Sequence, residues 1–198
     1  MTSISLKTIG KFARLTLLGI WGAVIAAAII FYFSDPSRFT ASNIAAFINT
    51  FQTEIWLVYF AMSVLRGFTL LPSTPLVLAG TFLYPNQPWL VLATSMTGIL
   101  VSSTLIYFCS EALGFSDYFE SKKPQAVSRI RRRLEHPFGV AFVGLWAFFP
   151  LLPTDAVCYV AGTTRMHFLK FILAVAAGEL VLCSIYVFSA GSLFRNWS

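Results

Sequence analysis

The sequence has little charge and little cysteine. Only 11% of its 198 residues are charged, whereas an average soluble domain has about 25%. Its three cysteines are isolated from one another, which indicates neither a disulfide framework nor a zinc site. The chain is instead 57% hydrophobic and 16% aromatic, with a mean hydropathy of +0.75. This balance excludes a disordered chain, a coiled coil and an ordinary soluble enzyme, and it indicates a small integral membrane protein.

The sequence also lacks the motifs of an enzyme. No nucleophile stands at a suitable spacing from a base, and no glycine-rich loop could cradle a phosphate. His136 and His167 have no partner at the spacing of metal ligands. We therefore expect no catalysis, no cofactor and no bound metal.

The basic excess points to membrane lipids as partners, not to nucleic acid. The net charge is +6, but most basic residues stand in short segments between apolar runs. Charge in that arrangement indicates membrane topology first and contact with anionic lipids second. The sequence leaves the oligomeric state open, a homo-oligomer included.

Residues 1–54 predict a transmembrane helix followed by an amphipathic helix. The run from Leu15 to Phe33 carries no charge and is long enough to cross the hydrocarbon core. A signal peptide is the alternative, although its apolar part is usually only about 7–15 residues long. Three basic residues and no acid precede the run, which places the N-terminus in the cytoplasm: Lys7, Lys11 and Arg14. The expected location is a bacterial inner membrane.

The amphipathic helix is expected over residues 42–55. Apolar residues recur there at helical spacing, with most polar residues off that stripe. Such a helix suits the membrane interface, and a helical loop packed on the bundle is the alternative.

The second region, residues 55–198, contains two apolar segments that prolines interrupt. They are 55–84 and 137–164. An apolar run without proline follows each of them, at 89–113 and 171–194. Proline lacks a backbone donor and clashes with the preceding turn, so we predict that each segment is a pair of half-helices. The predicted breaks involve Pro72, Pro75, Gly80, Pro150, Pro153 and Gly162.

The charge pattern then predicts re-entrant hairpins. Positive charge flanks residues 137–164 on both sides, so both ends should face the cytoplasm. These 28 residues cannot cross the membrane twice at 1.5 Å per residue. The expected fold is an all-α integral membrane protein with an inverted repeat of two re-entrant helical hairpins. A transmembrane helix follows each hairpin, and another begins the chain. The alternative is two proline-kinked spanning helices and six spans in all.

Interrupted helices of this kind mark candidate transport sites at the bilayer midplane. Broken helices leave backbone groups free, and these must be met by protein or water. Three ionisable residues lie near the breaks or in a span and are candidate substrate or proton sites: Arg66, Asp155 and Glu179. The alternatives are that Arg66 snorkels to the interface, that Asp155 caps a helix, and that Glu179 forms a structural pair with Arg66 or Arg165.

One hydrophilic segment separates the two halves of this region. Residues 114–136 contain a basic cluster that could contact anionic lipids or merely set the orientation: Arg129, Arg131, Arg132 and Arg133. Six aromatic residues near the ends of apolar runs are expected to anchor the chain at the interface: Trp56, Tyr59, Tyr84, Trp89, Tyr107 and Tyr118.

Two motifs carry a resemblance to a known family. The stretch from Leu70 to Pro85 resembles the first motif of the VTT domain, which defines the DedA or SNARE-associated Golgi protein family. Residues Phe148 to Asp155, closing with Ala161 and Gly162, resemble the second motif. The resemblance covers about residues 55–192. It implies two membrane-dipping hairpins and lipid flippase or scramblase activity, in bacteria on polyprenyl phosphates or aminophospholipids and linked to the proton-motive force.

The chain departs from the family pattern at two places. Many members carry an arginine where this sequence has Ala147, and the DedA branch places a glutamate near Ser73 or Thr74. These differences imply passive transport or a different coupling. The predicted function is therefore a lipid transporter for phospholipid or polyprenyl-phosphate headgroups. The alternatives are a proton-coupled transporter of small solutes or ions, and a membrane scaffold acting through the basic loop.

Overall fold

The computed structural model describes residues 2–112, 121–122, 124–150 and 152–195. Within these ranges the regular structure is entirely helical, as the sequence predicts. The α-helices are α1 (Thr2–Ser34), α2 (Ala41–Asn49), α3 (Ile55–Leu65), α4 (Thr74–Leu83), α5 (Pro88–Ala112), α7 (Pro124–Glu135), α8 (Pro137–Phe148), α9 (Thr154–Thr163) and α10 (Phe168–Arg195). The 3₁₀ helices are η1 (Pro36–Phe39), η2 (Gln52–Glu54) and η3 (Arg66–Thr69).

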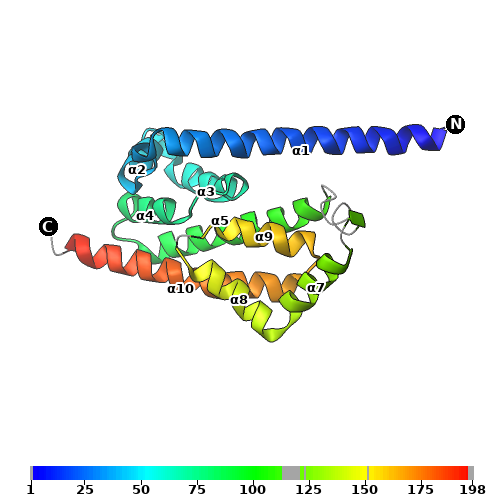
Figure 1. The fold of residues 1–198 in the computed structure, drawn as a ribbon. Helices are drawn as coiled ribbons and strands as arrows, with labels where there is room; N and C mark the ends of the chain where they lie inside the picture. Colours follow the sequence, from blue (N-terminus) through cyan, green and yellow to red (C-terminus); the bar gives the residue numbers. More distant parts are fainter. Residues whose placement is uncertain (1, 113–120, 123, 151, 196–198) are drawn as a thin grey trace.

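Helices α5 and α10 lie against each other at the centre of the fold and run in opposite directions (Figure 1). Both are long and apolar enough to cross a membrane, over Pro88–Ser110 and Phe168–Ser189. Large apolar side chains such as Phe108 and Leu173 are exposed on them, whereas Ser102 and Ser103 of α5 are buried. An apolar outside over a partly polar inside is the pattern of a membrane helix, which supports the predicted spans.

The proline-interrupted segments form two pairs of short helices. The first helix pair is α3 and α4, and the second helix pair is α8 and α9. Each of these helices has 10 to 12 residues, or about 15–18 Å at 1.5 Å per residue. That is roughly half of the 30 Å hydrocarbon core, so no single one of them could cross it.

Each helix pair packs on both long helices, one of its own half and one of the other half. Helix α3 packs on α5 and α8 packs on α10, so the first helix of each pair contacts the long helix that follows it in the chain. Helix α4 also packs on α10, and α9 packs on α5. The second helix of each pair therefore contacts the long helix of the other half. This exchange joins the two halves into one bundle.

Small residues permit the close crossings within each half. A Cβ atom on Gly98 of α5 would lie 2.5 Å from the Cβ of Ser63 on α3. A Cβ atom on Gly178 of α10 would lie 2.1 Å from the carbonyl oxygen of Gly144 on α8. Gly98 and Gly178 stand at the same position counted from the start of their helices. The same device thus fixes both crossings, as small residues do in membrane helices generally.

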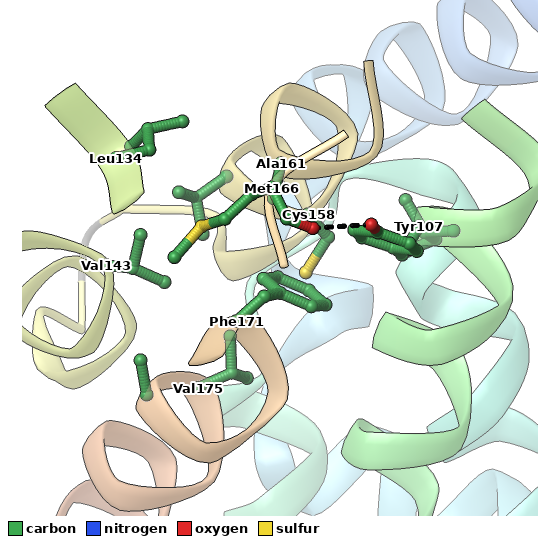
Figure 2. Close-up of a cluster of buried hydrophobic side chains, with 11 residues drawn as sticks. Tyr107, Leu134, Val143, Cys158, Ala161, Met166, Phe171 and Val175 are labelled. Carbon is green, nitrogen blue, oxygen red and sulfur yellow. Dashed lines mark hydrogen bonds between the residues drawn. The ribbon is translucent and has the colours of Figure 1, made fainter. Parts of the chain in front are cut away.

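The largest buried apolar cluster surrounds the second helix pair. Figure 2 shows Val143, Cys158, Ala161, Phe171 and Val175 meeting around Met166. The phenol of Tyr107 on α5 donates a hydrogen bond of 2.5 Å to the carbonyl of Met166. This bond fastens the turn between α9 and α10 to α5. A smaller cluster under the first helix pair contains Ile48, Tyr59 and Leu76.

The N-terminal part covers the first helix pair. Helix α1 lies along one side of the bundle and extends past it (Figure 1). The indole N–H of Trp21 donates to the hydroxyl of Tyr159 on α9 at 3.0 Å. The described apolar part of α1, Gly19–Ser34, is shorter than the spans of α5 and α10. That α1 crosses the membrane therefore stays a prediction.

Several local predictions need correction. Gly80 and Gly162 do not break helices but lie inside α4 and α9, where they face Tyr59 and the backbone of Tyr107. Pro75 lies in the first turn of α4, where its missing donor costs nothing. The amphipathic helix is shorter than predicted and ends at Asn49.

The hydrophilic segment and two of the aromatic residues also differ from expectation. Residues 124–135 of the basic segment form helix α7. Tyr59 and Tyr107 are 1% and 6% exposed, so neither anchors the chain at an interface. Trp56 and Trp89 are exposed, as an anchoring role requires, whereas Tyr118 lies outside the described residues.

The crossing of α8 and α10 can be tested with one added methyl group. In Gly178→Ala the new Cβ meets backbone that cannot turn away, so we expect a loss of about 1–3 kcal/mol of stability. Gly22→Ala is the matched control, because nothing lies within 4 Å of its Cβ position and alanine favours the helix. The midpoint of thermal unfolding in detergent measures both. Equal midpoints for the two variants would contradict the crossing.

Candidate functional site

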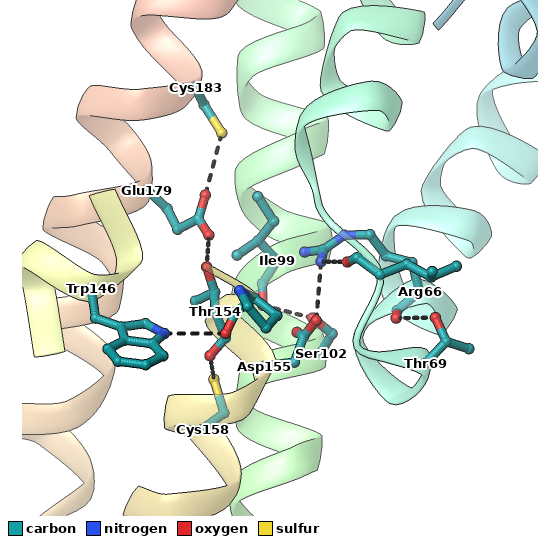
Figure 3. A network of polar contacts seen from close by, with 12 residues as sticks. Arg66, Thr69, Ile99, Ser102, Trp146, Thr154, Asp155, Cys158, Glu179 and Cys183 are labelled. Carbon is teal, nitrogen blue, oxygen red and sulfur yellow. Dashed lines mark hydrogen bonds and ion pairs between the residues drawn. The ribbon is translucent and has the colours of Figure 1, made fainter. Parts of the chain in front are cut away.

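Arg66, Asp155 and Glu179, far apart in the sequence, come together inside the bundle (Figure 3). Arg66 opens η3, directly after α3, while Asp155 lies in the first turn of α9. Glu179 comes from α10 and is fully buried. The three residues therefore meet where the breaks of the two helix pairs approach the long helix α10.

The Arg66 guanidinium joins the two helix pairs. Its Nη1 donates to Oδ2 of Asp155 at 3.3 Å and to the carbonyl oxygen of Leu71 at 3.3 Å. The side chains of Arg66 and Asp155 are only 9% and 1% exposed. Leu70 has a φ of 59°, in the left-handed region, and this turn sets the direction of the chain just before Leu71.

Glu179 is held by uncharged donors. The hydroxyl of Thr154 donates to Oε1 at 2.5 Å, and the thiol of Cys183 donates to Oε2 at 3.7 Å. Thr154 precedes Asp155 in α9. Two adjacent residues thus contact the two partners, Thr154 by a hydrogen bond to Glu179 and Asp155 by an ion pair with Arg66. The indole N–H of Trp146 donates to the carbonyl of Pro153 at 3.2 Å. That bond ties α8 to the start of α9, where the same carbonyl also accepts the backbone N–H of Ala156 at 3.1 Å.

Two polar atoms of this cluster have no hydrogen-bond partner among the described residues. They are Nη2 of Arg66 and Oδ1 of Asp155, both buried. A Cβ atom on Gly67 would lie 3.1 Å from Oδ1 and 2.8 Å from Ser102, so only glycine leaves room beside the carboxylate. Buried polar atoms without partners are costly, which favours binding of a further polar group.

The charges of the cluster do not balance. One guanidinium faces two buried carboxyl groups, and both carboxyl groups lie within its electrostatic range. With both carboxyl groups ionised, the cluster would hold a buried net negative charge, which is expensive in a low-dielectric interior. The arrangement can therefore take up a proton, and it can exchange one anionic partner of Arg66 for another.

The structure decides against the simplest alternatives for Arg66 and Asp155. Arg66 is buried and paired, so it does not snorkel to the interface. The residue that caps α9 is Pro153, and no side chain caps that helix. Glu179 is hydrogen-bonded by Thr154 and Cys183 and lies within electrostatic range of Arg66, so a structural role beside Arg66 stays an alternative for it.

The basic cluster lies elsewhere, on the exposed helix α7. Arg131 pairs with Glu135 at 3.3 Å. A hollow of about 380 Å³ is lined by Gln125, Ser128, Arg129, Arg132 and Arg133. These arginines belong to the end of the molecule that carries the turn between α9 and α10 (Figure 1). They take no part in the buried cluster.

Ala147 stands where the family resemblance implies an arginine. Ala147 is fully buried on α8, with its Cβ 3.0 Å from the Cβ position of Gly178 on α10. An arginine side chain would not fit between these helices without moving one of them. In this chain the cation of the cluster comes from Arg66 on the other helix pair.

Sequence reasoning missed Thr154 and Trp146. One signal could have found Thr154. The tripeptide Leu-Leu-Pro occurs at 70–72 and 151–153, and Ala-Gly-Thr follows each copy, at 79–81 and 161–163. This internal repeat places Thr154 directly after the second Leu-Leu-Pro. No comparable pattern points to Trp146, whose role depends on how α8 meets the break.

Comparison with known proteins finds a match to one family of proteins. The family model of the VTT domain matches residues 71–192, more than half of the chain. The match contains α4, α5, α7, the second helix pair and most of α10, and it begins after Arg66 and η3. No curated protein and no solved structure matches the chain significantly.

The ion pair between Arg66 and Asp155 can be tested by removing its cation. Arg66→Met leaves a buried carboxylate without its charged partner, so we expect a loss of about 3–5 kcal/mol in stability. The double variant Arg66→Met/Asp155→Asn should recover part of that loss. Thermal unfolding in lipid nanodiscs measures both variants.

Arg38→Met is the matched control for that experiment. Arg38 pairs with Asp35 at 2.8 Å, but both side chains are largely exposed. The Ser37 hydroxyl and the Arg38 guanidinium hold the pKa of Asp35 below its usual value. The Asp35 side chain is exposed, so the loss of Arg38 does not leave a buried charge without a partner. We therefore expect little change in the unfolding midpoint. An Arg66 variant as stable as the Arg38 variant would show that the buried ion pair does not contribute to stability.

Proposed function

The chain belongs to the VTT-domain family, a family of DedA-type membrane proteins, and on that premise we propose that it carries lipid headgroups across the bilayer. The lipid tails stay in the hydrocarbon while the headgroup passes through the polar interior of the bundle. The cargo is a phospholipid or a polyprenyl phosphate. The protein acts as a transporter, not as an enzyme.

One observation carries this proposal: a buried cluster of three ionisable residues lies at the breaks of two helix pairs. Charged groups inside a bilayer are costly and usually serve an ion or substrate path. Broken helices at membrane depth also need protein or water around their free backbone groups. Both features at one place support a polar route through the middle of the protein.

We propose that both helix pairs are re-entrant and enter from opposite faces. Their helices are too short to cross the membrane singly. The exchanged packing on the antiparallel helices α5 and α10 supports an inverted repeat. In Figure 1, α2 and the C-terminus lie toward one end of the bundle, and α7 lies toward the other. Each pair would then return to the face from which it came.

Arg66 receives the phosphate of the headgroup in this scheme. A guanidinium binds phosphate oxygens through two parallel N–H donors, and Nη2 of Arg66 is free to offer one of them. The phosphate then replaces Asp155 as the partner of Arg66. Asp155 and Glu179 must then both be protonated, so that no unpaired carboxylate stays in the interior.

The orientation that we propose is an N-terminus in the cytoplasm and a bacterial inner membrane as the location. Basic residues collect on the cytoplasmic side of membrane proteins. The N-terminus of α1 and the arginine-rich helix α7 lie toward the same end of the molecule in Figure 1. The basic N-terminal residues and the basic α7 would thus face the same compartment.

Transport can be measured in liposomes that contain headgroup-labelled lipid. We expect Arg66→Gln, Asp155→Asn and Glu179→Gln to slow the movement of lipid between leaflets by about ten- to hundredfold, the loss expected for one charged hydrogen bond. Glu135→Gln is the control, because this carboxylate lies on the exposed helix α7. It should leave the rate unchanged.

The same preparation separates the rival functions. Wild-type protein that moves lipid no faster than empty vesicles would overturn the proposal. A solute transporter would lose pH-dependent uptake in Asp155→Asn and Glu179→Gln while lipid movement stays intact. A scaffold would depend instead on the four arginines of α7 and tolerate both carboxylate changes.

Cysteine labelling tests the re-entrant topology. Single cysteines are introduced into a cysteine-free background at four exposed positions outside the short helices: Gln52, Asn86, Gln125 and His167. Gln52→Cys and Asn86→Cys flank the first helix pair and should react with an impermeant reagent from one face. Gln125→Cys and His167→Cys flank the second helix pair and should react only from the other. A pair whose two flanks react from opposite faces spans the membrane and is not re-entrant.

A further inference from the structure

A cavity of about 540 Å³ lies between the N-terminal part of the chain and the first helix pair. Arg66 is one of its lining residues, so the cavity reaches the charged cluster. The rest of its wall is mostly apolar and includes Phe31, Ile44, Met62, Leu71 and Pro75, with Asn43 as a polar member. Such a wall suits a hydrocarbon chain far better than a hydrated ion.

The charged residues of the lining have one sign. They are Arg66 and Arg38, and the lining contains no acidic residue. Arg38 is exposed and paired with Asp35. Arg66 is more than nine-tenths buried, and its Nη2 has no hydrogen-bond partner in the described structure. A buried guanidinium with an unused donor favours an anionic group over a neutral or a cationic one.

We propose that this cavity is a binding site for an anionic amphiphile, with its chain on the apolar wall and its anionic group on the Arg66 guanidinium. The inference rests on the proposed function, because it supplies the place where a lipid reaches the polar cluster from the side. The occupant is a lipid. A free anion would leave the apolar wall uncovered, and a cationic amphiphile would find no acidic side chain in the lining.

The N-terminal part of the chain is essential to this site. Phe31, Phe39, Ile44 and Phe47 belong to α1, η1 and α2, all before the start of the region that matches the VTT domain. The VTT region supplies Leu71, Pro72, Pro75 and Leu76, while Met62 and Arg66 lie just before it. The N-terminal part supplies the opposite wall. The site is therefore assembled from both regions of the chain.

Binding can be measured by native mass spectrometry of the full chain purified in detergent. The probes are dodecyl phosphate, dodecyltrimethylammonium and inorganic phosphate. We expect dodecyl phosphate to bind about tenfold more tightly than dodecyltrimethylammonium, as one charge-assisted hydrogen bond allows. Inorganic phosphate should not displace it. Equal affinities for the two amphiphiles, or displacement by inorganic phosphate, would overturn the proposal.

A cavity-filling variant locates the site. Ile44→Trp places a large side chain from α2 into the cavity and should weaken dodecyl phosphate binding about tenfold. Ala46→Trp is the matched control, because Ala46 is exposed on the same helix and does not line the cavity. Similar binding by both variants would mean that the amphiphile binds elsewhere.

The two proposals can fail separately. If Ile44→Trp and wild type bind the amphiphile equally while lipid transport persists, the cavity is not the access site and the transport function stands. If dodecyl phosphate binds as expected but wild-type protein moves no lipid in liposomes, the cavity binds an amphiphile and the transport function is wrong.

Discussion

The ion pair between Arg66 and Asp155 joins the two helix pairs where burial of charge costs the most free energy. Arg66 follows the first helix of one pair, and Asp155 begins the second helix of the other. Either charge alone in this interior would cost several kcal/mol. Neither helix pair can therefore be buried with its charge unless the other pair is docked against it. The long helices α5 and α10 provide the surface on which both pairs dock.

The breaks beside these residues impose a second constraint. A helix that stops inside the bundle exposes backbone groups, and each needs a partner. Arg66 serves the carbonyl of Leu71, and Trp146 adds a second donor to the carbonyl of Pro153, which also accepts the N–H of Ala156. The side chains that complete the breaks are thus partly those that form the charged cluster. A change in the cluster, such as the loss of the Arg66 charge, also disturbs the backbone around it.

Much of the fold could be predicted from the sequence, because prolines and long uncharged runs act locally. Pro72 and Pro150 mark the two breaks, and the apolar runs mark α5 and α10. The contacts could not be predicted in the same way. Whether Tyr59 lies at an interface or inside depends on Gly80 of another helix. The partner of Glu179 likewise depends on how the first turn of α9 meets α10, which no spacing in the sequence encodes.

The two halves are alike in helix lengths and crossings but not in charge. The first helix pair contributes the cation of the cluster, and the second half contributes both carboxyl groups. A motion that parts the two helix pairs must therefore separate Arg66 from Asp155. Such a motion avoids leaving buried charges unpaired only if an anion replaces Asp155 at Arg66 and a proton neutralises Asp155. A headgroup phosphate satisfies the first condition. The free energy needed to separate Arg66 from Asp155 would therefore couple movement of the helix pairs to binding of the phosphate.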